Sequence, residues 1–267
     1  MTAWQRSGQV NLVDLVIVTG GSRGIGAALL RQWPAEGPVR RMVVARGAPT
    51  EDVLPPQAGD HPDVVVERLD LADPATWEVL AQRLHEQLSD QRWDRIAFVH
   101  AAATLTPIGF VGDVDGAAYA IAAILDAAAP MAVGEAFMRA LASTDHAGAD
   151  VVLVQISSGA ATKAMPGWSA YCAGKAAVDQ WVRVVGAEAT QRGTGVRVLA
   201  IAPGVVATAM QDEIRDASPA DFPGVDRFID LHATDQLADA DEVARKLWAL
   251  ALDPATPTGS VLDIRNA

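Results

Sequence analysis

Tyr171 and Lys175 have the types and the spacing that acid–base chemistry on a bound substrate requires. They form a Tyr-x-x-x-Lys pair in a stretch with helical character, so the two side chains share one helix face. An ammonium beside a phenol favours the phenolate and lowers the usual tyrosine pKa of about 10 toward the range useful for proton transfer. Ser158 lies upstream at the end of an apolar run, where its hydroxyl can bond a substrate oxygen as charge develops. Taken singly, each is also an ordinary surface or turn residue, and Ser157 is a rival for the role of the serine.

A glycine-rich turn earlier in the chain predicts a phosphate-binding site. It follows the first apolar run, precedes a helical segment and begins at Thr19. Glycines let the backbone approach a pyrophosphate closely, and the following helix presents free N–H groups and the positive end of its dipole. A glycine cluster alone also fits a plain tight turn, but its position between a strand and a helix favours the phosphate site. The candidate binding residues are Gly20, Ser22, Arg23, Gly24, Ile25 and Gly26.

The Thr-Gly-x-x-x-Gly-x-Gly spacing, together with the serine, tyrosine and lysine, resembles the short-chain dehydrogenase/reductase family over about Leu15 to Ile264. The resemblance implies a nicotinamide dinucleotide that delivers hydride to a carbonyl carbon. It implies that Tyr171 protonates the oxygen, Ser158 orients it, and Lys175 lowers the tyrosine pKa and bonds the nicotinamide ribose. Further cofactor contacts implied by the resemblance are Asp70, Ala101, Pro203, Gly204, Val206 and Thr208. An N-cap or loop role for the aspartate and an ordinary turn at the Pro-Gly pair stay open as alternatives.

The choice between NAD and NADP depends on the charge at the end of the second predicted strand. An acidic residue there accepts hydrogen bonds from the ribose hydroxyls and repels a 2′-phosphate. The family position that is usually acidic in NAD-specific members resembles Ala45, and Arg46 follows it. With Arg23, this gives two guanidinium groups suited to a phosphate. We therefore expect NADP(H), with two solvated surface arginines as the alternative.

The chain departs from the family at two places. Asn-Asn-Ala-Gly usually follows the fourth strand, and this chain has His100-Ala101-Ala102-Ala103, which lacks an amide that braces the sheet and a glycine beside the cofactor. The family asparagine that anchors a water in a proton relay resembles Asp126. A carboxylate can still hold a water and accept from Lys175, while its charge raises the pKa of Tyr171. We expect Asp126 to belong to a working but altered catalytic set, and a solvated helix face is the alternative.

The surroundings of the tyrosine are similar to those of the sepiapterin reductase branch, which includes bacterial diketone (benzil) reductases. The similarity lies in Gly167–Ala177 and Thr104–Gly109. It implies a small-molecule carbonyl substrate, first a ketone or diketone, with pterin, 3-oxoacyl thioester and sugar reductases as alternatives. Trp168 and Asp263 are candidate substrate contacts besides the catalytic serine and tyrosine, and core packing is the alternative for Trp168. A catalytically impaired NADP(H)-binding sensor is the rival from another class.

These residues need a scaffold that brings distant segments together, and the order of apolar runs predicts one. Continuous runs rich in valine, isoleucine and leucine are typical of strands buried on both faces of a parallel sheet. The predicted strands are Leu15–Thr19, Arg41–Ala45, Val64–Arg68, Arg95–His100, Val151–Ile156, Val196–Ala202 and Ser260–Ile264. The predicted helices are Gly24–Trp33, Pro74–Ser89, Gly116–Leu141 and Ser169–Thr190. The alternation predicts a single-domain α/β fold, a Rossmann-like doubly wound parallel sheet flanked by helices. A mobile substrate loop is expected over 209–235.

Length, composition and charge limit the classes of function. The chain has 267 residues, half of them hydrophobic, which suits one domain over 1–267. A formal net charge of −12 opposes nucleic-acid binding. The one cysteine, Cys172, excludes an internal disulfide and a metal site of several cysteines, and the histidines show no metal-ligand spacing, so we expect no metal.

The same reading predicts a cytoplasmic protein without membrane association. Ala117–Val133 reads as too short, and too broken by Asp126 and Pro130, to span a bilayer. The first apolar run does not resemble a signal peptide, and a reducing compartment is the default. The family resemblance implies a homodimer or homotetramer that packs through the helices containing residues 116–141 and 169–190.

Overall fold

One parallel sheet of seven strands organises the part of the chain that the computed structural model describes, residues 13–47, 49 and 64–266. The strand order is β3-β2-β1-β4-β5-β6-β7. The strands are β1 Asp14–Thr19, β2 Val39–Ala45, β3 Val64–Arg68, β4 Arg95–His100, β5 Asp150–Ile156, β6 Arg197–Ala202 and β7 Val261–Asp263. Each predicted strand is present, with ends that agree within two residues. The predicted Rossmann-like fold class is confirmed.

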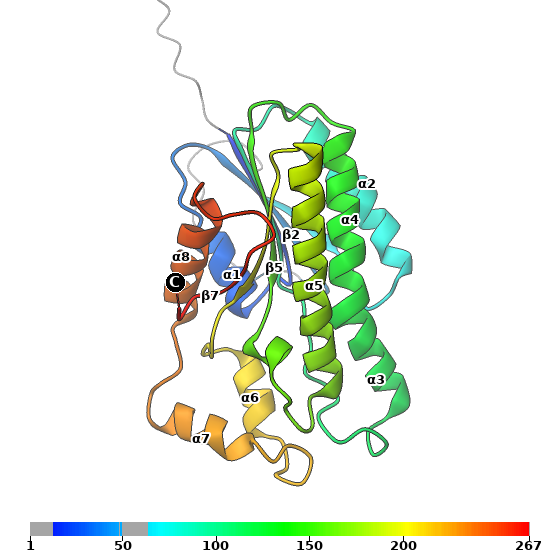
Figure 1. Ribbon diagram of the computed structural model, residues 1–267, viewed down its shortest axis with the longest axis vertical. Coiled ribbons are helices and arrows are strands. Elements are labelled where there is room, and N and C mark those ends of the chain that lie inside the picture. Colours follow the sequence, from blue (N-terminus) through cyan, green and yellow to red (C-terminus); the bar gives the residue numbers. More distant parts are fainter. Residues whose placement is uncertain (1–12, 48, 50–63, 267) are drawn as a thin grey trace, which may run out of the picture.

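Helices cover both faces of this sheet (Figure 1). The helices α2, α4 and α5 lie on one face, whereas α1 and α8 lie on the other. Their bounds are α1 Gly24–Arg31, α2 Ala75–Ser89, α3 Gly116–Ala123, α4 Ala129–Ala142, α5 Ser169–Arg192, α6 Ala209–Arg215, α7 Val225–Ala233 and α8 Ala240–Leu252. A π-helical turn, η2 (Ile124–Ala128), joins α3 to α4, and a 3-10 turn, η3 (Gly159–Thr162), follows β5.

Apolar residues of the strands fill both layers between sheet and helices. Because successive side chains of a strand point to opposite faces, each strand contributes to two cores. On the α1/α8 face, Trp248 packs edge-on against Trp33 with ring centroids 4.7 Å apart. On the α2/α4/α5 face, Phe98 stacks on Phe137 at 4.9 Å. Burial on both faces explains why the strands read as continuous apolar runs.

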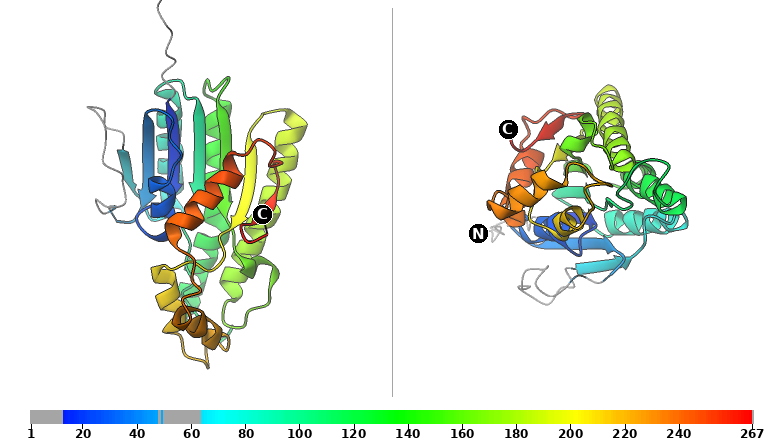
Figure 2. Two further views of the ribbon diagram at one scale, coloured as in Figure 1. Left: turned by 90° about the vertical axis from the view of Figure 1, so that its left-hand side faces the viewer. Right: turned by 90° about the horizontal axis from the view of Figure 1, so that it is seen from below.

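The carboxyl edge of the sheet is where the predicted site residues gather. Residues at the carboxyl ends of β1, β4 and β5 lie side by side in register: Thr19, the last of β1, beside His100, the last of β4, and His100 beside Gln155, the next to last of β5. From β1 the chain continues outward to β2, and from β4 it continues in the other direction, so the order reverses between these neighbours. In open parallel sheets, ligands bind at the carboxyl ends beside such a reversal. Seen from below, α6 and α7 lie across this end of the sheet (Figure 2).

Two helices stand where the sequence led us to expect a loop over 209–235, which corrects the expected secondary structure; a mobile segment at the substrate stays a prediction. They are α6 and α7, and the prolines that suggested a loop, Pro219 and Pro223, lie in the connection between them. Phe222, in that connection, and Phe228, on α7, are buried and attach the segment to the rest of the molecule. Burial of a few aromatic side chains therefore stabilises two short helices that local composition did not predict.

Helix α8 is a further element that the sequence did not lead us to expect. The carboxylate of Asp239 accepts the backbone N–H of Glu242 at 2.9 Å and caps the helix. An Asp-x-x-Glu pattern before an apolar, periodic stretch is a helix-start pattern that could have found it. The buried face of α8 includes Leu247 and Trp248, which cover α1 and the sheet.

The apolar stretch 116–142 forms a helix interrupted by the π-turn η2. Pro130, at the start of α4, has no N–H to donate to the carbonyl one turn earlier, which is consistent with the irregular turn before it. Within the described residues, this is the helix that is long and apolar enough to cross a membrane by length and composition, so the expectation that it is too short is not met. Its α4 part buries Val133 and Phe137 against the sheet and neighbouring helices.

Candidate active site

The glycine turn between β1 and α1 has backbone geometry that side chains would obstruct. Gly20 and Gly24 adopt φ values of +68° and +57°, in the left-handed region that glycine favours. A Cβ on Gly20 would lie 2.7 Å from the backbone nitrogen of Ala102, and one on Gly26 would lie 2.4 Å from the carbonyl oxygen of Gly20. The turn therefore packs closely against the start of its own helix and against the segment after β4.

The amino end of α1 fits the phosphates of a dinucleotide. Arg23, at the N-cap, makes no side-chain capping bond, and no acidic residue lies in the first turn of this helix. Its first N–H groups and its dipole are thus directed at the turn without an acidic side chain competing there. Ser22 and Ile25 are half-buried beside them. The backbone N–H groups and the dipole of α1 together fit the phosphates that the glycine pattern predicted.

Two arginines border this end of the site, and both are exposed. Arg23 is 68% exposed and lies 3.9 Å from the carboxylate of Glu213, a loose surface pair. Arg46 directly follows β2 and is exposed. The carboxylate of Asp70, after β3, accepts the backbone N–H of Ala72 at 3.1 Å. Asp70 thus stabilises its own turn, the alternative role that the sequence left open, and its exposed position still leaves it accessible to a ligand.

The segment after β6, which contains Pro203 and Gly204, meets the glycine turn at Thr208. Gly204 has a φ of +76°, and a Cβ on Gly24 would meet Thr208 at 3.4 Å. Val206 is buried and forms an isolated parallel bridge with Ala238. The turn after β6 and the turn after β1 therefore form two walls of one region.

Tyr171, Lys175 and Ser158 come together at the carboxyl end of β5. Tyr171 and Lys175 project from one face of α5, with the ammonium 5.6 Å from the centroid of the phenol ring. The ammonium donates to the carbonyl of Ile156 at 2.8 Å, which attaches it to the end of β5. Ser158 follows that strand, and its hydroxyl interacts with the phenol in the sense that favours the phenolate. The rival Ser157 instead donates to Asp179 and is buried.

Burial, more than the lysine, sets the acidity of the tyrosine here. Burial raises the pKa of Tyr171 to about 12, Ser158 opposes this rise, and the charge of Asp126 adds to it. Burial also lowers the pKa of Lys175, while Asp126 and Asp179 act in the opposite direction. The sequence led us to expect that the ammonium lowers the tyrosine pKa; in the structure, desolvation of the phenolate outweighs any such effect.

Asp126 is buried beside this group and does not lie on a solvated face. It is 1% exposed, and one carboxylate oxygen accepts the backbone N–H of Thr104 at 2.9 Å. Burial raises its pKa to about 6, against the lowering influence of Lys175 and Thr104. Gly174 allows this close packing, because a Cβ there would lie 2.7 Å from the Cβ of Asp126. The solvated alternative is therefore excluded.

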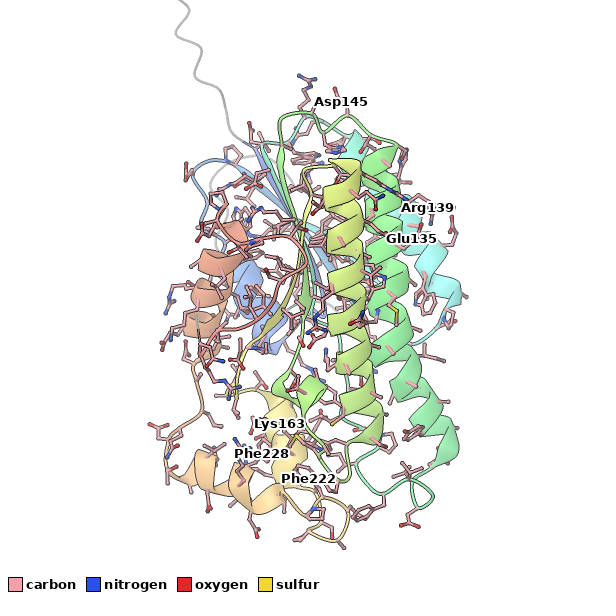
Figure 3. All side chains as sticks on the ribbon, in the orientation of Figure 1. Glu135, Arg139, Asp145, Lys163, Phe222 and Phe228 are labelled. Atoms are coloured by element: carbon pink, nitrogen blue, oxygen red, sulfur yellow. The ribbon has the colours of Figure 1, made fainter. Side chains whose placement is uncertain are left out.

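An aromatic cluster covers the tyrosine from the side of α6 and α7. Trp168 stacks on Phe222 with centroids 4.4 Å apart and meets Tyr171 edge-on at 5.8 Å. Figure 3 labels Phe222 and Phe228 beside these helices, below the sheet. Trp168 is buried, as core packing requires, and its indole N–H has no hydrogen-bond partner among the described residues. The sequence reading missed both phenylalanines, because only the fold brings them to the tyrosine.

A cavity of about 310 Å³ opens between Ser158 and the last strand. Asp263 is part of its lining, so the serine and this candidate contact do share a hollow, whereas Trp168 and Tyr171 lie outside its lining. Arg265 engages both carboxylate oxygens of Asp263, with Nε 2.8 Å from Oδ1, and this pairing lowers the aspartate pKa. Any ligand of Asp263 therefore competes with an arginine that the sequence reading did not single out.

Thr19 and His100 form a contact that the sequence did not predict. The hydroxyl of Thr19 lies 3.0 Å from Nδ1 of His100, and it accepts the backbone N–H of Ala101 at 3.2 Å. Side chain and backbone thus brace the segment after β4, where the family has an asparagine. Ala101 and Ala103 lie in this segment without the left-handed backbone that would require glycine.

Comparisons with known proteins agree with this geometry. A sequence model of the short chain dehydrogenase family matches residues 14–219. A benzil reductase ((S)-benzoin forming) of Bacillus subtilis (strain 168) is 31% identical over 254 residues, covering 95% of this chain and 99% of the relative. Sepiapterin reductase of Mus musculus is 30% identical over 255 residues, covering 92% and 95%. The resemblance expected from the motifs is confirmed.

A solved structure shares the fold. The short chain dehydrogenase/reductase from Saccharomyces cerevisiae superposes with a TM-score of 0.75 at 24% identity, over 94% of this chain and 96% of that one. At this level of identity the similarity supports the arrangement of strands and helices alone.

Proposed function

We propose, because the chain belongs to the short-chain dehydrogenase family, that it reduces the carbonyl group of a ketone or diketone to an alcohol with NADPH. Membership makes it an oxidoreductase with a nicotinamide cofactor and a small-molecule substrate. The observation that carries the proposal is the convergence of Tyr171, Lys175 and Ser158 at the carboxyl edge, beside a glycine turn that fits a dinucleotide.

The bound nicotinamide supplies the hydride that adds to the carbonyl carbon. The residues of the chain supply the proton and the orientation. Tyr171, protonated throughout the neutral range because burial raises its pKa to about 12, donates its proton to the oxygen that becomes the hydroxyl. Ser158 donates a hydrogen bond to the same oxygen as negative charge develops. Lys175, fixed by the carbonyl of Ile156, keeps a positive charge beside the phenol after its proton has left.

The preference for NADPH rests on charge at the adenosine end. Arg46 occupies the end of β2, and Arg23 lies in the glycine turn, so two exposed guanidinium groups border the position of a 2′-phosphate. Asp70 lies after the neighbouring strand, where the family contacts adenine, and Ala101 lies on the opposite side of the turn. No acidic residue at the end of β2 opposes a phosphate in this proposal.

The substrate proposal rests on relatives and on the aromatic cluster. The relatives include a benzil reductase, which suggests diketones, and a sepiapterin reductase, which suggests pterin side-chain ketones as the second choice. Trp168 and Phe222 beside the tyrosine suit a flat, apolar substrate. The pairing of Asp263 with Arg265 favours the diketone over the pterin, because the carboxylate is already engaged. A 3-oxoacyl thioester or sugar remains a weaker alternative.

Assembly and location are part of the proposal. We propose a cytoplasmic homodimer or homotetramer that packs through the helices containing residues 116–141 (α3, η2 and α4) and 169–190 (α5), where Val184 is 47% exposed. The convergence of Tyr171, Lys175 and Ser158, with Tyr171 and Lys175 buried, disfavours the catalytically impaired sensor. It stays the rival that the following experiment separates.

The experiment is a panel of diketones, ketones and pterins assayed with NADPH and with NADH. We expect turnover of diketones and a preference for NADPH. Arg46→Ala should raise KM for NADPH by about 10- to 150-fold and leave that for NADH unchanged, since one charge-assisted phosphate contact contributes about 1.5–3 kcal/mol. Arg92→Ala, which removes an exposed arginine from the other end of the sheet, is the matched control. Cofactor binding without turnover of any carbonyl would favour the sensor.

A further inference from the structure

The last residues of the chain lie beside the turns that follow β5 and β6. Asp263, which ends β7, is in register with Ala202, which ends β6, and the backbone N–H of Ile264 donates to the carbonyl of Ala202 at 3.2 Å. The side chain of Arg265 follows directly and is exposed. The C-terminal segment is thus attached to the carboxyl edge of the sheet, where the proposed catalytic side chains lie.

The side chain of Arg265 passes both turns at a glycine. A Cβ on Gly159 would lie 3.6 Å from Nη2 of Arg265, and a Cβ on Gly204 would lie 3.4 Å from its Cδ. Gly159 directly follows Ser158, and Gly204 lies in the turn for which the family resemblance implies a cofactor contact. The aliphatic part of the side chain therefore lies along the turn after β6, and the guanidinium lies beside the backbone next to Ser158.

Asp263 holds this guanidinium in one orientation. Its Oδ1 accepts Nε of Arg265 at 2.8 Å and the backbone N–H of the same residue at 3.0 Å, and its Oδ2 accepts Nη2. This hydrogen bonding lowers the pKa of Asp263, so the carboxylate stays charged at neutral pH. Because a two-point pair fixes the plane of the guanidinium as well as its position, Arg265 has the orientation that a specific contact requires.

The pair leaves part of the guanidinium available to a ligand. An arginine side chain carries five N–H donors, and Asp263 accepts one from Nε and one from Nη2. The remaining N–H groups have no hydrogen-bond acceptor in the part of the chain that the structure describes. The side chain is 49% exposed, so these donors are accessible.

The cavity of about 310 Å³ described above adjoins this arginine. Ser158, Gly159 and Asp263 all contribute to its lining. The same hollow therefore borders both the serine proposed to orient the reacting carbonyl and the carboxylate that anchors Arg265. A substrate with one oxygen at Ser158 can direct a second oxygen toward the guanidinium.

The charges around the guanidinium favour a neutral acceptor. Asp263 balances the charge of Arg265, and Lys163, the further cation that acts on Asp263, does so more weakly and is exposed. Lys163 is labelled in Figure 3 and directly follows η3. A carboxylate group on a substrate would lie beside the carboxylate of Asp263 and be repelled, whereas a carbonyl oxygen accepts from the guanidinium without this cost.

We propose that Arg265 is a specificity-determining residue, which donates to the second carbonyl oxygen of a vicinal diketone while the first carbonyl is reduced at Tyr171 and Ser158. This inference rests on the proposed function and narrows its substrate class from ketones in general to neutral dicarbonyl compounds. Asp263 acts on the substrate through Arg265, as the residue that positions it.

The first test measures binding and needs no turnover. An enzyme loaded with NADP⁺ cannot reduce benzil, so calorimetry gives the Kd of benzil for this complex. Arg265→Met should raise that Kd by about 10- to 150-fold, because it removes a hydrogen bond from a charged group. The Kd of the matched monoketone, in which a methylene replaces the second carbonyl, should not change. Arg92→Met, at the other end of the sheet, is the control and should change neither value.

The second test changes the charge beside the arginine. Asp263→Asn leaves Arg265 with an unbalanced positive charge, so kcat/KM should shift from benzil toward the 2-oxo acid in which a carboxylate replaces the second benzoyl group. A wild-type preference for that 2-oxo acid over benzil would overturn the proposal.

The two tests also separate this inference from the proposed function. Equal losses for benzil and the monoketone in Arg265→Met, or no loss for either, would overturn the role of Arg265 even if the wild type reduces diketones. If the wild type reduces no carbonyl and Arg265→Met still weakens the binding of benzil alone, the role of Arg265 stands and the proposed function fails.

Discussion

The two faces of the sheet differ most at the level where the strands end. On the α1/α8 face, the side chains next to the carboxyl edge are Val18, Val99 and Val154, all at most 2% exposed and packed on apolar neighbours. On the other face, one residue further along each strand, the side chains are Thr19, His100 and Gln155. The α1/α8 face stays apolar up to the carboxyl edge of the sheet, whereas the α2/α4/α5 face is polar at that edge.

The difference means that one face of the sheet mainly stabilises the fold, whereas the other face holds residues of the proposed reaction. An apolar layer up to the edge excludes water and holds α1, so the glycine turn has a fixed position. On the other face, Lys175 donates to the carbonyl of Ile156 and Asp126 accepts the backbone N–H of Thr104, in a place where unpaired charges would otherwise be costly. The comparison predicts that substitutions on the two faces separate into losses of activity and losses of stability.

The largest expected effect follows from replacing Tyr171, the proposed proton donor. Tyr171→Phe removes the proton donor and leaves the ring in its cluster with Trp168, so kcat/KM should fall by up to about 10⁴-fold with little change in Tm. Steady-state kinetics and thermal unfolding of the same preparation measure both. Tyr119→Phe, which removes the hydroxyl of the other tyrosine, is the control and should keep full activity. Equal losses in both variants would mean that the phenol of Tyr171 has no special role.

The next effect belongs to the apolar face. Trp248→Ala empties a site against Trp33 and leaves the carbonyl of Leu29 without the indole N–H that it accepts at 3.0 Å. Unfolding in denaturant should show a loss of about 3–5 kcal/mol, while kcat of the remaining folded protein stays near the wild-type value. Trp77→Ala, on α2 and only partly buried, should cost less. A large fall in kcat for Trp248→Ala at full folding would contradict the separation of the faces.

The same contrast explains what the sequence could predict. Strands buried on both faces produce continuous apolar runs, so β1 to β6 and the positions of Tyr171 and Lys175 followed from pattern alone. Helices α6 and α7 did not, because they are stabilised by Phe222 and Phe228 packing against residues far away in the chain. The row of Thr19, His100 and Gln155 was also hidden, because register between β1, β4 and β5 places these residues of three separate segments side by side.

The smallest effect concerns a charge between the two catalytic groups. Asp126→Asn removes the carboxylate that raises the pKa of Tyr171, so the phenol should lose its proton at lower pH. Because reduction requires the protonated phenol, the alkaline fall in kcat should move to lower pH. A limb near pH 6, where the pKa of Asp126 lies, should disappear. Asp115→Asn, which changes an exposed capping carboxylate on α3 in the same way, should alter neither limb. An unchanged profile in Asp126→Asn would remove Asp126 from the reaction and leave it a structural partner of Thr104.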